Sequence, residues 1–264
     1  MKRILTILLA AALPLLASAQ ISESELDTDI GARVGATLDK KLAKGLHLQL
    51  EGEARLNDNL SNFKRWDLGL GMTYKVNPYL KIGGGYVLIN RENSSAVWKF
   101  RHRVYLDAMG SVSAGDWRFS LKERLQLTHK DVNAYKHQST PNSLTLKSRL
   151  KAAYKGFNAW EPYAYVELRN VFNDPACTAT WSSVSEAFAD YSFTGYTHAY
   201  VNRLRGSLGA EYKISKAHAL DFYLLADYTK DKETDTGSSG TVLKSLTWQR
   251  GFSAALCVGY KFSF

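Results

Sequence analysis

Histidine, serine and acidic side chains that could support hydrolysis gather in one stretch of the 264-residue sequence. They are His102, His129, Asp131, His137, Ser139 and Ser143. Nucleophilic catalysis needs a nucleophile, a base and an orienting group within hydrogen-bond reach of one another. The spacing of these residues matches no nucleophile motif. We therefore predict no catalytic residue, and hydrolysis at an exposed rim of the fold stays open as a further alternative.

The two cysteines, Cys177 and Cys257, complete the set of reactive side chains. The first falls in a long polar stretch and the second in the C-terminal apolar segment, so a disulfide would need the polar stretch to fold into the interior. We expect two separate thiols. The sequence contains no cluster of cysteine and histidine, no glycine-rich phosphate loop and no calcium-loop spacing. It therefore predicts no metal site and no cofactor.

Positively charged side chains outnumber negatively charged ones in the chain. The 34 Lys and Arg exceed the 25 Asp and Glu and give a formal net charge of +9. Many stand at every second position, as Arg203 and Arg205 do on either side of Leu204. A period of two is typical of a β-strand with one polar and one apolar face. Because these charges are scattered over many segments, they do not form the basic helix or stripe of a nucleic-acid-binding protein.

The first twenty residues have the anatomy of a secretory signal peptide. Lys2 and Arg3 precede an apolar stretch at positions 4–16, and Ala17-Ser18-Ala19 supplies the small residues of a cleavage site. The apolar stretch is too short for a membrane helix, which needs about 20 residues. We predict a signal peptide at 1–20 and one exported domain at 21–264.

The exported domain alternates apolar and polar residues in about eleven segments of roughly 9–12 residues, the length with which a tilted strand crosses a bilayer. We predict an all-β fold, a single antiparallel transmembrane β-barrel in the bacterial outer membrane. The alternative, a soluble sandwich or lipocalin-like barrel, would have shorter strands. Bacterial barrels have even strand numbers. We therefore expect about twelve strands, with ten as the alternative, and residues 21–29 would form a weak extra strand or cross the interior.

In such a barrel the polar face of each strand lines the interior, where Lys and Arg outnumber Asp and Glu roughly two to one. The expected lumen charge network comprises Arg33, Glu51, Glu53, Arg55, Arg65, Asp67, Arg101, Arg103, Asp107, Lys122, Arg124, Lys147, Arg149, Glu167, Arg169, Arg203, Arg205 and Glu211. Charges in a narrow interior must pair or stay hydrated. We predict an ion-paired structural plug. A narrow anion-preferring pore or binding cavity is the alternative, because surplus cations concentrate anions.

Two polar residues interrupt the apolar faces. Glu123 and His102 both fall on the side of their strands that would face lipid. A carboxylate in lipid is costly. A β-bulge that turns Glu123 inward would remove that cost.

The C-terminal residues Tyr260, Phe262 and Phe264 alternate with polar residues and resemble the terminal signal of outer-membrane proteins. That resemblance implies recognition by the outer-membrane assembly machinery. The other expected contacts are membrane lipid and the phosphates of lipopolysaccharide near the outer rim.

Four segments, at 101–107, 116–125, 161–168 and 221–224, carry a more specific resemblance. With them, residues 27–264 resemble the outer-membrane barrel family catalogued as domain of unknown function 2490. The resemblance implies a barrel fold and an outer-membrane location, and it brings no catalytic residue to transfer.

Overall fold

The computed structural model describes residues 22–93, 96–130, 137–237 and 242–264. The predicted signal peptide lies outside the described residues. Eleven strands occur in the described part of the chain: β1 (Ser22–Ala43), β2 (Leu46–Asn57), β3 (Asn62–Lys75), β4 (Leu80–Glu92), β5 (Trp98–Ala114), β6 (Trp117–Lys130), β7 (Asn142–Tyr154), β8 (Trp160–Ser182), β9 (Ala187–Lys213), β10 (His218–Thr236) and β11 (Leu243–Ser263). None of the described residues belongs to a helix long and apolar enough to cross a membrane.

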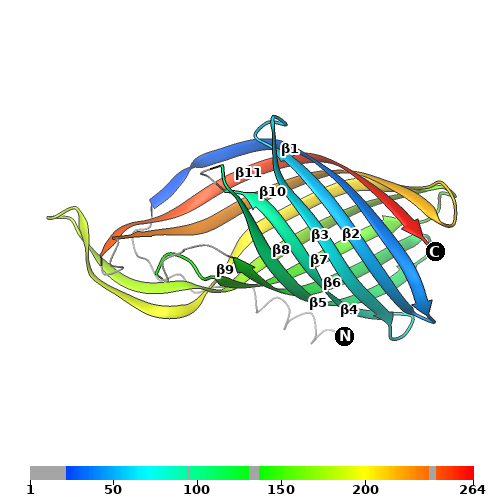
Figure 1. The fold of residues 1–264 in the computed structure, drawn as a ribbon, viewed down its shortest axis with the longest axis horizontal. Helices are drawn as coiled ribbons and strands as arrows, with labels where there is room; N and C mark the ends of the chain where they lie inside the picture. The colour runs from blue at the N-terminus through cyan, green and yellow to red at the C-terminus, as the bar shows by residue number, and fades with distance from the viewer. Residues whose placement is uncertain (1–21, 94–95, 131–136, 238–241) are drawn as a thin grey trace.

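The strands form one closed barrel in sequence order (Figure 1). Each strand pairs antiparallel with the next, while β1 and β11 close the barrel in parallel, with Arg33 opposite Cys257. The barrel thus has an odd number of described strands, one fewer than the twelve favoured from the sequence. Residues 22–29 extend β1 instead of forming a separate strand, and the parallel seam makes an even number unnecessary.

The longest connection between consecutive strands, from β6 to β7, lies at one end of the barrel, although β2–β3 and β8–β9 at that same end are joined as tightly as strands at the other end. Short turns join β1–β2, β3–β4, β5–β6, β7–β8 and β9–β10 at one end, which also holds the C-terminus; we call this the short-turn end. The opposite long-loop end holds the remaining connections and the start of β1. There β8 and β9 continue beyond their neighbours as a projecting hairpin (Figure 1). Their pairing reaches Ser182 and Ala187, whereas β9 pairs with β10 only as far as Arg203.

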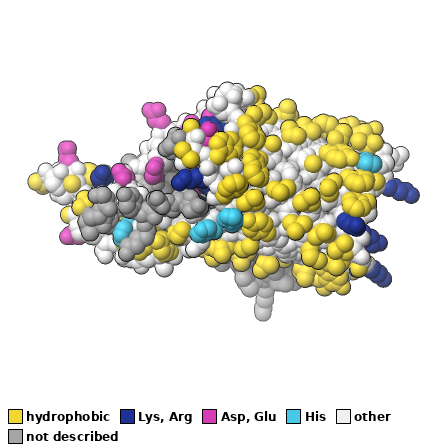
Figure 2. Space-filling model, in the orientation of Figure 1, with side chains coloured by type: hydrophobic (Ala, Val, Ile, Leu, Met, Phe, Trp, Pro, Cys, Tyr) yellow, Lys and Arg dark blue, Asp and Glu magenta, His cyan; other side chains and the backbone are white. Residues whose placement is uncertain are grey.

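The outward face of the barrel is apolar. Leu106 and Leu208 are each 66% exposed, and Figure 2 shows hydrophobic side chains spread over the visible face of the strands, with most charged side chains toward the two ends. The inward-facing Glu167 and Arg205 are buried. Apolar surface on this scale is not left in water by a soluble monomer. The alternation of side chains therefore gives the barrel the inside-out pattern of a membrane-spanning β-barrel.

The two polar residues on the outward face keep their place. Glu123 lies outward because the pairing of β6 with both neighbours contains no bulge. Its carboxylate accepts a hydrogen bond of 2.6 Å from the Ser148 hydroxyl. The Nδ1 atom of His102 lies 2.5 Å from the Tyr86 hydroxyl. Local hydrogen bonds, and not a change of register, thus compensate both groups.

Gly85 makes room for a large side chain inside the barrel. A Cβ atom at this position would lie 2.5 Å from the Leu70 carbonyl oxygen and 2.7 Å from the Tyr105 hydroxyl. Glycine is required here because the backbone and Tyr105 approach so closely. The guanidinium of Arg124 in turn lies 3.9 Å from the ring centre of Tyr105.

Candidate functional site

Four cavities follow one another through the barrel interior. The long-loop chamber, of about 350 Å³, and the central chamber, of about 460 Å³, share Arg103 and Lys147 among their lining residues. The central chamber shares Arg33 and Glu53 with a third cavity of about 240 Å³. The third shares Lys261 with a cavity of about 480 Å³ at the short-turn end. Adjoining cavities therefore extend from one end of the barrel to the other.

The structure brings the residues of the expected lumen network to these cavities. The central chamber is lined by Arg33, Glu51, Glu53, Arg55, Asp67, Arg103, Lys122, Arg124, Lys147, Arg149, Glu167 and Arg205. Arg65, Arg101, Arg169 and Arg203 line the long-loop chamber, and Glu211 lines the third cavity. Asp107 is the exception, since it lies behind the lining and binds Arg124 and Lys122.

Glu167 on β8 is the centre of an ion-pair cluster. Its Oε2 atom accepts a hydrogen bond of 2.6 Å from Arg149, and its Oε1 atom accepts one of 2.7 Å from Arg203. Arg205 lies 4.0 Å from the same carboxylate and binds Asp227 through two hydrogen bonds of 2.6 and 2.7 Å. Such charge-assisted bonds to Arg fix both partners in position. The cluster ties together four neighbouring strands, β7 to β10.

These ion pairs run around the wall and not across the interior. Every ion pair that joins two strands in the described residues connects adjacent strands or strands two apart. This follows from the pairing register, which places Arg149 opposite Glu167 and Glu167 opposite Arg205. Charge pairing therefore stabilises the wall and leaves the cavities open between its sides.

The register also places like charges directly opposite one another. The first row is Arg33, Arg55, Arg65 and Arg91 on β1 to β4. The second row is Arg124, Lys147, Arg169 and Arg203 on β6 to β9. Like charges in directly opposed positions are destabilising. Six of these eight side chains line the long-loop chamber, namely Arg55, Arg65, Arg91, Lys147, Arg169 and Arg203.

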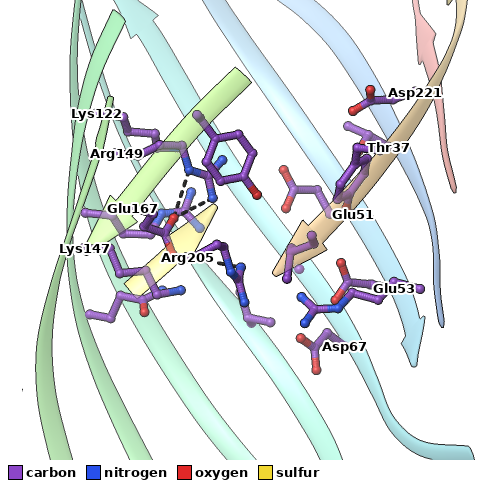
Figure 3. A pocket seen from close by; sticks show the side chains of 18 of the residues that line it. Thr37, Glu51, Glu53, Asp67, Lys122, Lys147, Arg149, Glu167, Arg205 and Asp221 are labelled. Carbon is purple, nitrogen blue, oxygen red and sulfur yellow. Dashed lines mark hydrogen bonds and ion pairs between the residues drawn. The ribbon is translucent and has the colours of Figure 1, made fainter. Parts of the chain in front are cut away.

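The central chamber has sides of different charge. Figure 3 shows Lys122, Lys147 and Arg149 on one side of the pocket and Glu51 and Asp67 on the other. A solute in this chamber would meet a field directed across the barrel axis.

Tyrosines support the cations of the central chamber. The guanidinium of Arg149 lies 4.3 Å from the ring centre of Tyr165, and the ammonium of Lys151 lies 3.6 Å from that of Tyr163. Cations over aromatic faces are attracted to the ring and are held in place. These tyrosines were not predicted as lumen residues, although they fall on the polar face of their strand's alternation.

The long-loop chamber carries the larger excess of positive charge. Its described lining includes eleven Lys and Arg but only two acids, Asp174 and Asp231. Both acids are already engaged, because Lys232 lies 3.3 Å from Asp174 and the Asn202 amide donates a hydrogen bond of 2.6 Å to Asp231. Lys232 also donates a hydrogen bond to the Pro175 carbonyl. This contact could not be predicted from the sequence because it joins an extended part of β10 to β8 across β9.

Comparison with known proteins identifies the family. The model of a family of proteins of unknown function, DUF2490, matches residues 34–238. The chain belongs to this family. The resemblance predicted from the sequence is thereby confirmed.

Two solved structures are similar to this DUF2490 protein. The NanC porin is 12% identical with a TM-score of 0.44, and the match covers 89% of this chain and 99% of the porin. OmpT of Vibrio cholerae is 12% identical with a TM-score of 0.35, and the match covers 82% of this chain and 64% of OmpT. The search of curated proteins found no match.

The structure separates the hydrolytic candidates of this DUF2490 protein. His129 and His102 pair across β5 and β6, and His129 contacts the Asn142 side chain at 2.8 Å on the outward face. Ser139 and Ser143 line the long-loop chamber on the inward face. His137 stacks edge-on against Phe193, and Asp131 lies outside the described residues. Among the described candidates, no serine hydroxyl is therefore hydrogen-bonded to a histidine.

The cysteines of this DUF2490 protein are separate. Cys177 is half-buried in the projecting hairpin, Cys257 is fully buried in β11, and both are free thiols, as expected. The described residues contain no group of three His, Cys, Asp or Glu side chains placed to hold a metal ion.

Proposed function

We propose that the chain is a bacterial outer-membrane barrel whose interior forms a narrow anion-preferring passage or binding cavity. The observation that supports this function best is the series of adjoining cavities lined by a surplus of Lys and Arg. The alternative of an ion-paired plug would require the charges to cancel across the interior, whereas the ion pairs lie along the wall.

The outward surface supports the membrane location. The outward side chains of the strands are apolar, as contact with lipid requires, and strand lengths in bacterial barrels are set by the thickness of the bilayer. Bacterial barrels keep short turns in the periplasm and longer loops outside the cell. The short-turn end is therefore periplasmic in this proposal, and the long-loop end faces outward, where basic side chains would meet lipopolysaccharide phosphates.

The C-terminus supports assembly into the same membrane. Phe264 is exposed beside Phe262, with ring centres 5.1 Å apart, and Tyr260 lies 2.6 Å from the Nδ1 atom of His218. In our proposal this aromatic column is the assembly signal that the outer-membrane machinery recognises. The predicted signal peptide at 1–20 would bring the chain to that machinery.

Anion preference follows from the charge of the lining. Fixed cations raise the local concentration of anions in a confined passage and repel cations. The cavity at the short-turn end repeats the pattern, since Lys41, Lys75, Lys81 and Lys261 line it together with one acidic side chain, Asp39, among the described residues. An anion would thus meet surplus positive charge at both ends of the barrel.

The Glu167 cluster favours the second candidate function, a structural plug. It neutralises several cations over β7 to β10, which reduces the positive charge that would attract an anion on that side. In this case the charges serve the stability of the barrel, and no solute passes.

Conductance in a planar bilayer decides between the two. If the interior is a passage, the purified barrel conducts. Its reversal potential under a KCl gradient then has the sign of the chloride equilibrium potential. Replacing Arg101 and Arg103 by glutamine moves that potential toward zero, while Arg118→Gln, which removes a charge that lines none of the four cavities, leaves it unchanged. Absence of conductance favours the plug, and a potential on the potassium side refutes the anion preference.

A further inference from the structure

The long-loop chamber contains cations that the protein leaves without counter-charges. Arg101, Arg103 and Lys147 form no ion pair with any described carboxylate. The Nε atoms of Arg101 and Arg203 are buried and have no hydrogen-bond partner among the described residues. Buried donors without partners cost stability. Because the side chains of Arg101, Arg103 and Lys147 line the cavity, an anion from outside the chain would supply the counter-charge that the described carboxylates do not.

The two rows of like charge stand on opposite sides of this chamber. Three members of the first row lie on β2 to β4, and three members of the second row lie on β7 to β9. The two groups are five strands apart in a closed barrel of eleven described strands, so they are nearly opposite across the axis. One small molecule between them can contact both.

From this arrangement we propose that the long-loop chamber binds a small anion with at least two oxyanion groups, one facing each row. Carboxylates and phosphates share the planar or tetrahedral oxygens that arginine binds with paired hydrogen bonds. The inference rests on the proposed anion preference and adds to it a class of ligand and a place.

Two contact points favour multivalent anions for a physical reason. When the first oxyanion group binds one row, the second group is held near the other row at a high effective concentration. A monovalent anion gains only one of these contacts. The chamber volume of about 350 Å³ lies within the usual range of small-molecule sites.

Binding is measured by titration calorimetry on the folded full-length barrel in neutral detergent, at matched ionic strength. The probes are inorganic pyrophosphate, citrate and acetate. We expect pyrophosphate and citrate to bind at least about tenfold more tightly than acetate. Tight binding of both identifies the shared oxyanion chemistry, and tight binding of pyrophosphate alone restricts the class to phosphates. Equal affinity of all three overturns the proposal.

Single substitutions test the contribution of each row. Arg91→Gln removes a charge from the first row and Lys147→Gln one from the second, and neither residue takes part in an ion pair of the described network. Each variant should bind pyrophosphate no more tightly than acetate, while the control Arg118→Gln keeps its tighter binding of pyrophosphate. Lys147→Gln should also unfold at a higher urea concentration, because it removes a buried like charge. Retained preference in both variants contradicts a site between the rows.

This experiment separates the ligand class from the proposed function. A barrel that conducts chloride but binds the three anions equally keeps its anion preference and loses the multivalent site. A barrel that binds pyrophosphate tightly without conducting keeps the site, and its passage function is refuted.

Discussion

Replacing Glu167 by glutamine tests whether the ion-pair cluster stabilises the barrel wall. The carboxylate is 2% exposed and is the centre of three arginines. Glutamine keeps the shape and one acceptor oxygen, but it removes the negative charge. Breaking a buried ion pair by neutralising one partner costs about 3–5 kcal/mol, because the other charge is left uncompensated.

The loss of the Glu167 charge would not affect the three arginines equally. Arg205 keeps its two hydrogen bonds to Asp227, and Arg149, with 35% of its side chain exposed, can be hydrated. Arg203 is 10% exposed, and Glu167 is its sole ion-pair partner among the described residues. One buried charge is therefore left uncompensated, and we expect the lower end of the range, about 3 kcal/mol.

The loss is measured by urea unfolding in lipid vesicles, followed by tryptophan fluorescence. The matched control is Asp58→Asn in the β2–β3 turn, where Asp58 is half-exposed and lies 2.9 Å from Lys64. The hydrogen bond from Lys64 lowers the pKa of the Asp58 carboxyl, yet water screens this pair and we expect no measurable change. A loss below about 1 kcal/mol for Glu167→Gln would show that the lumen screens its charges as a protein surface does, and the argument for a buried cluster would fail. In conductance, the same variant should be more anion-selective.

Three further predictions concern the wall and its assembly. Leu106→Arg places a charge on the lipid face at the middle of β5 and should lower the free energy of unfolding in vesicles by about 2–4 kcal/mol. An unchanged free energy of unfolding would mean that this face does not contact lipid. Gly85→Val should reduce the folded fraction seen as a gel shift without heating, because its side chain collides with Tyr105 and the Leu70 carbonyl; normal folding would contradict the close approach. Phe264→Ala should lower the amount of barrel assembled in cells while the purified chain refolds normally, and equal assembly would exclude Phe264 from the signal.

The direction of side chains could be predicted from the sequence because it depends on one strand at a time. Leu204 and Leu208 had to face away from Arg203 and Arg205 once the segment was assigned as a strand. The exposed leucines and buried arginines of β9 agree with this. The same rule placed Glu123 outward, and the unbroken register of β6 keeps it there.

The opposition of charges could not be predicted, since it depends on pairing between strands. Alternation predicts that Arg33, Arg55 and Arg65 face inward, but it does not say which residues lie side by side, and it did not include Arg91 in the interior. A shift of two residues in one strand would keep every side chain on its face and break the row. The cation rows, and the chamber that they line, therefore became visible only in the three-dimensional structure.

The closure of the barrel depended on a pairing between the two ends of the sequence. The run from Ser22 to Asp29 has few apolar residues and predicts a weak strand at best. In the structure it aligns beside β11, where Ser24 accepts hydrogen bonds from Arg250. No local sequence pattern could predict that contact, because its two residues lie near opposite ends of the sequence.

The parallel seam between β1 and β11 places the start of β1 and the C-terminus at opposite ends of the barrel. In the proposed orientation, a peptide tag inserted before Ser22 would be reachable by an antibody on intact cells, while one attached after Phe264 would stay hidden until the envelope is opened. A barrel with an even number of crossings would carry both tags on one side. A single doubly tagged chain can thus report its own orientation in the membrane, whether or not the barrel conducts.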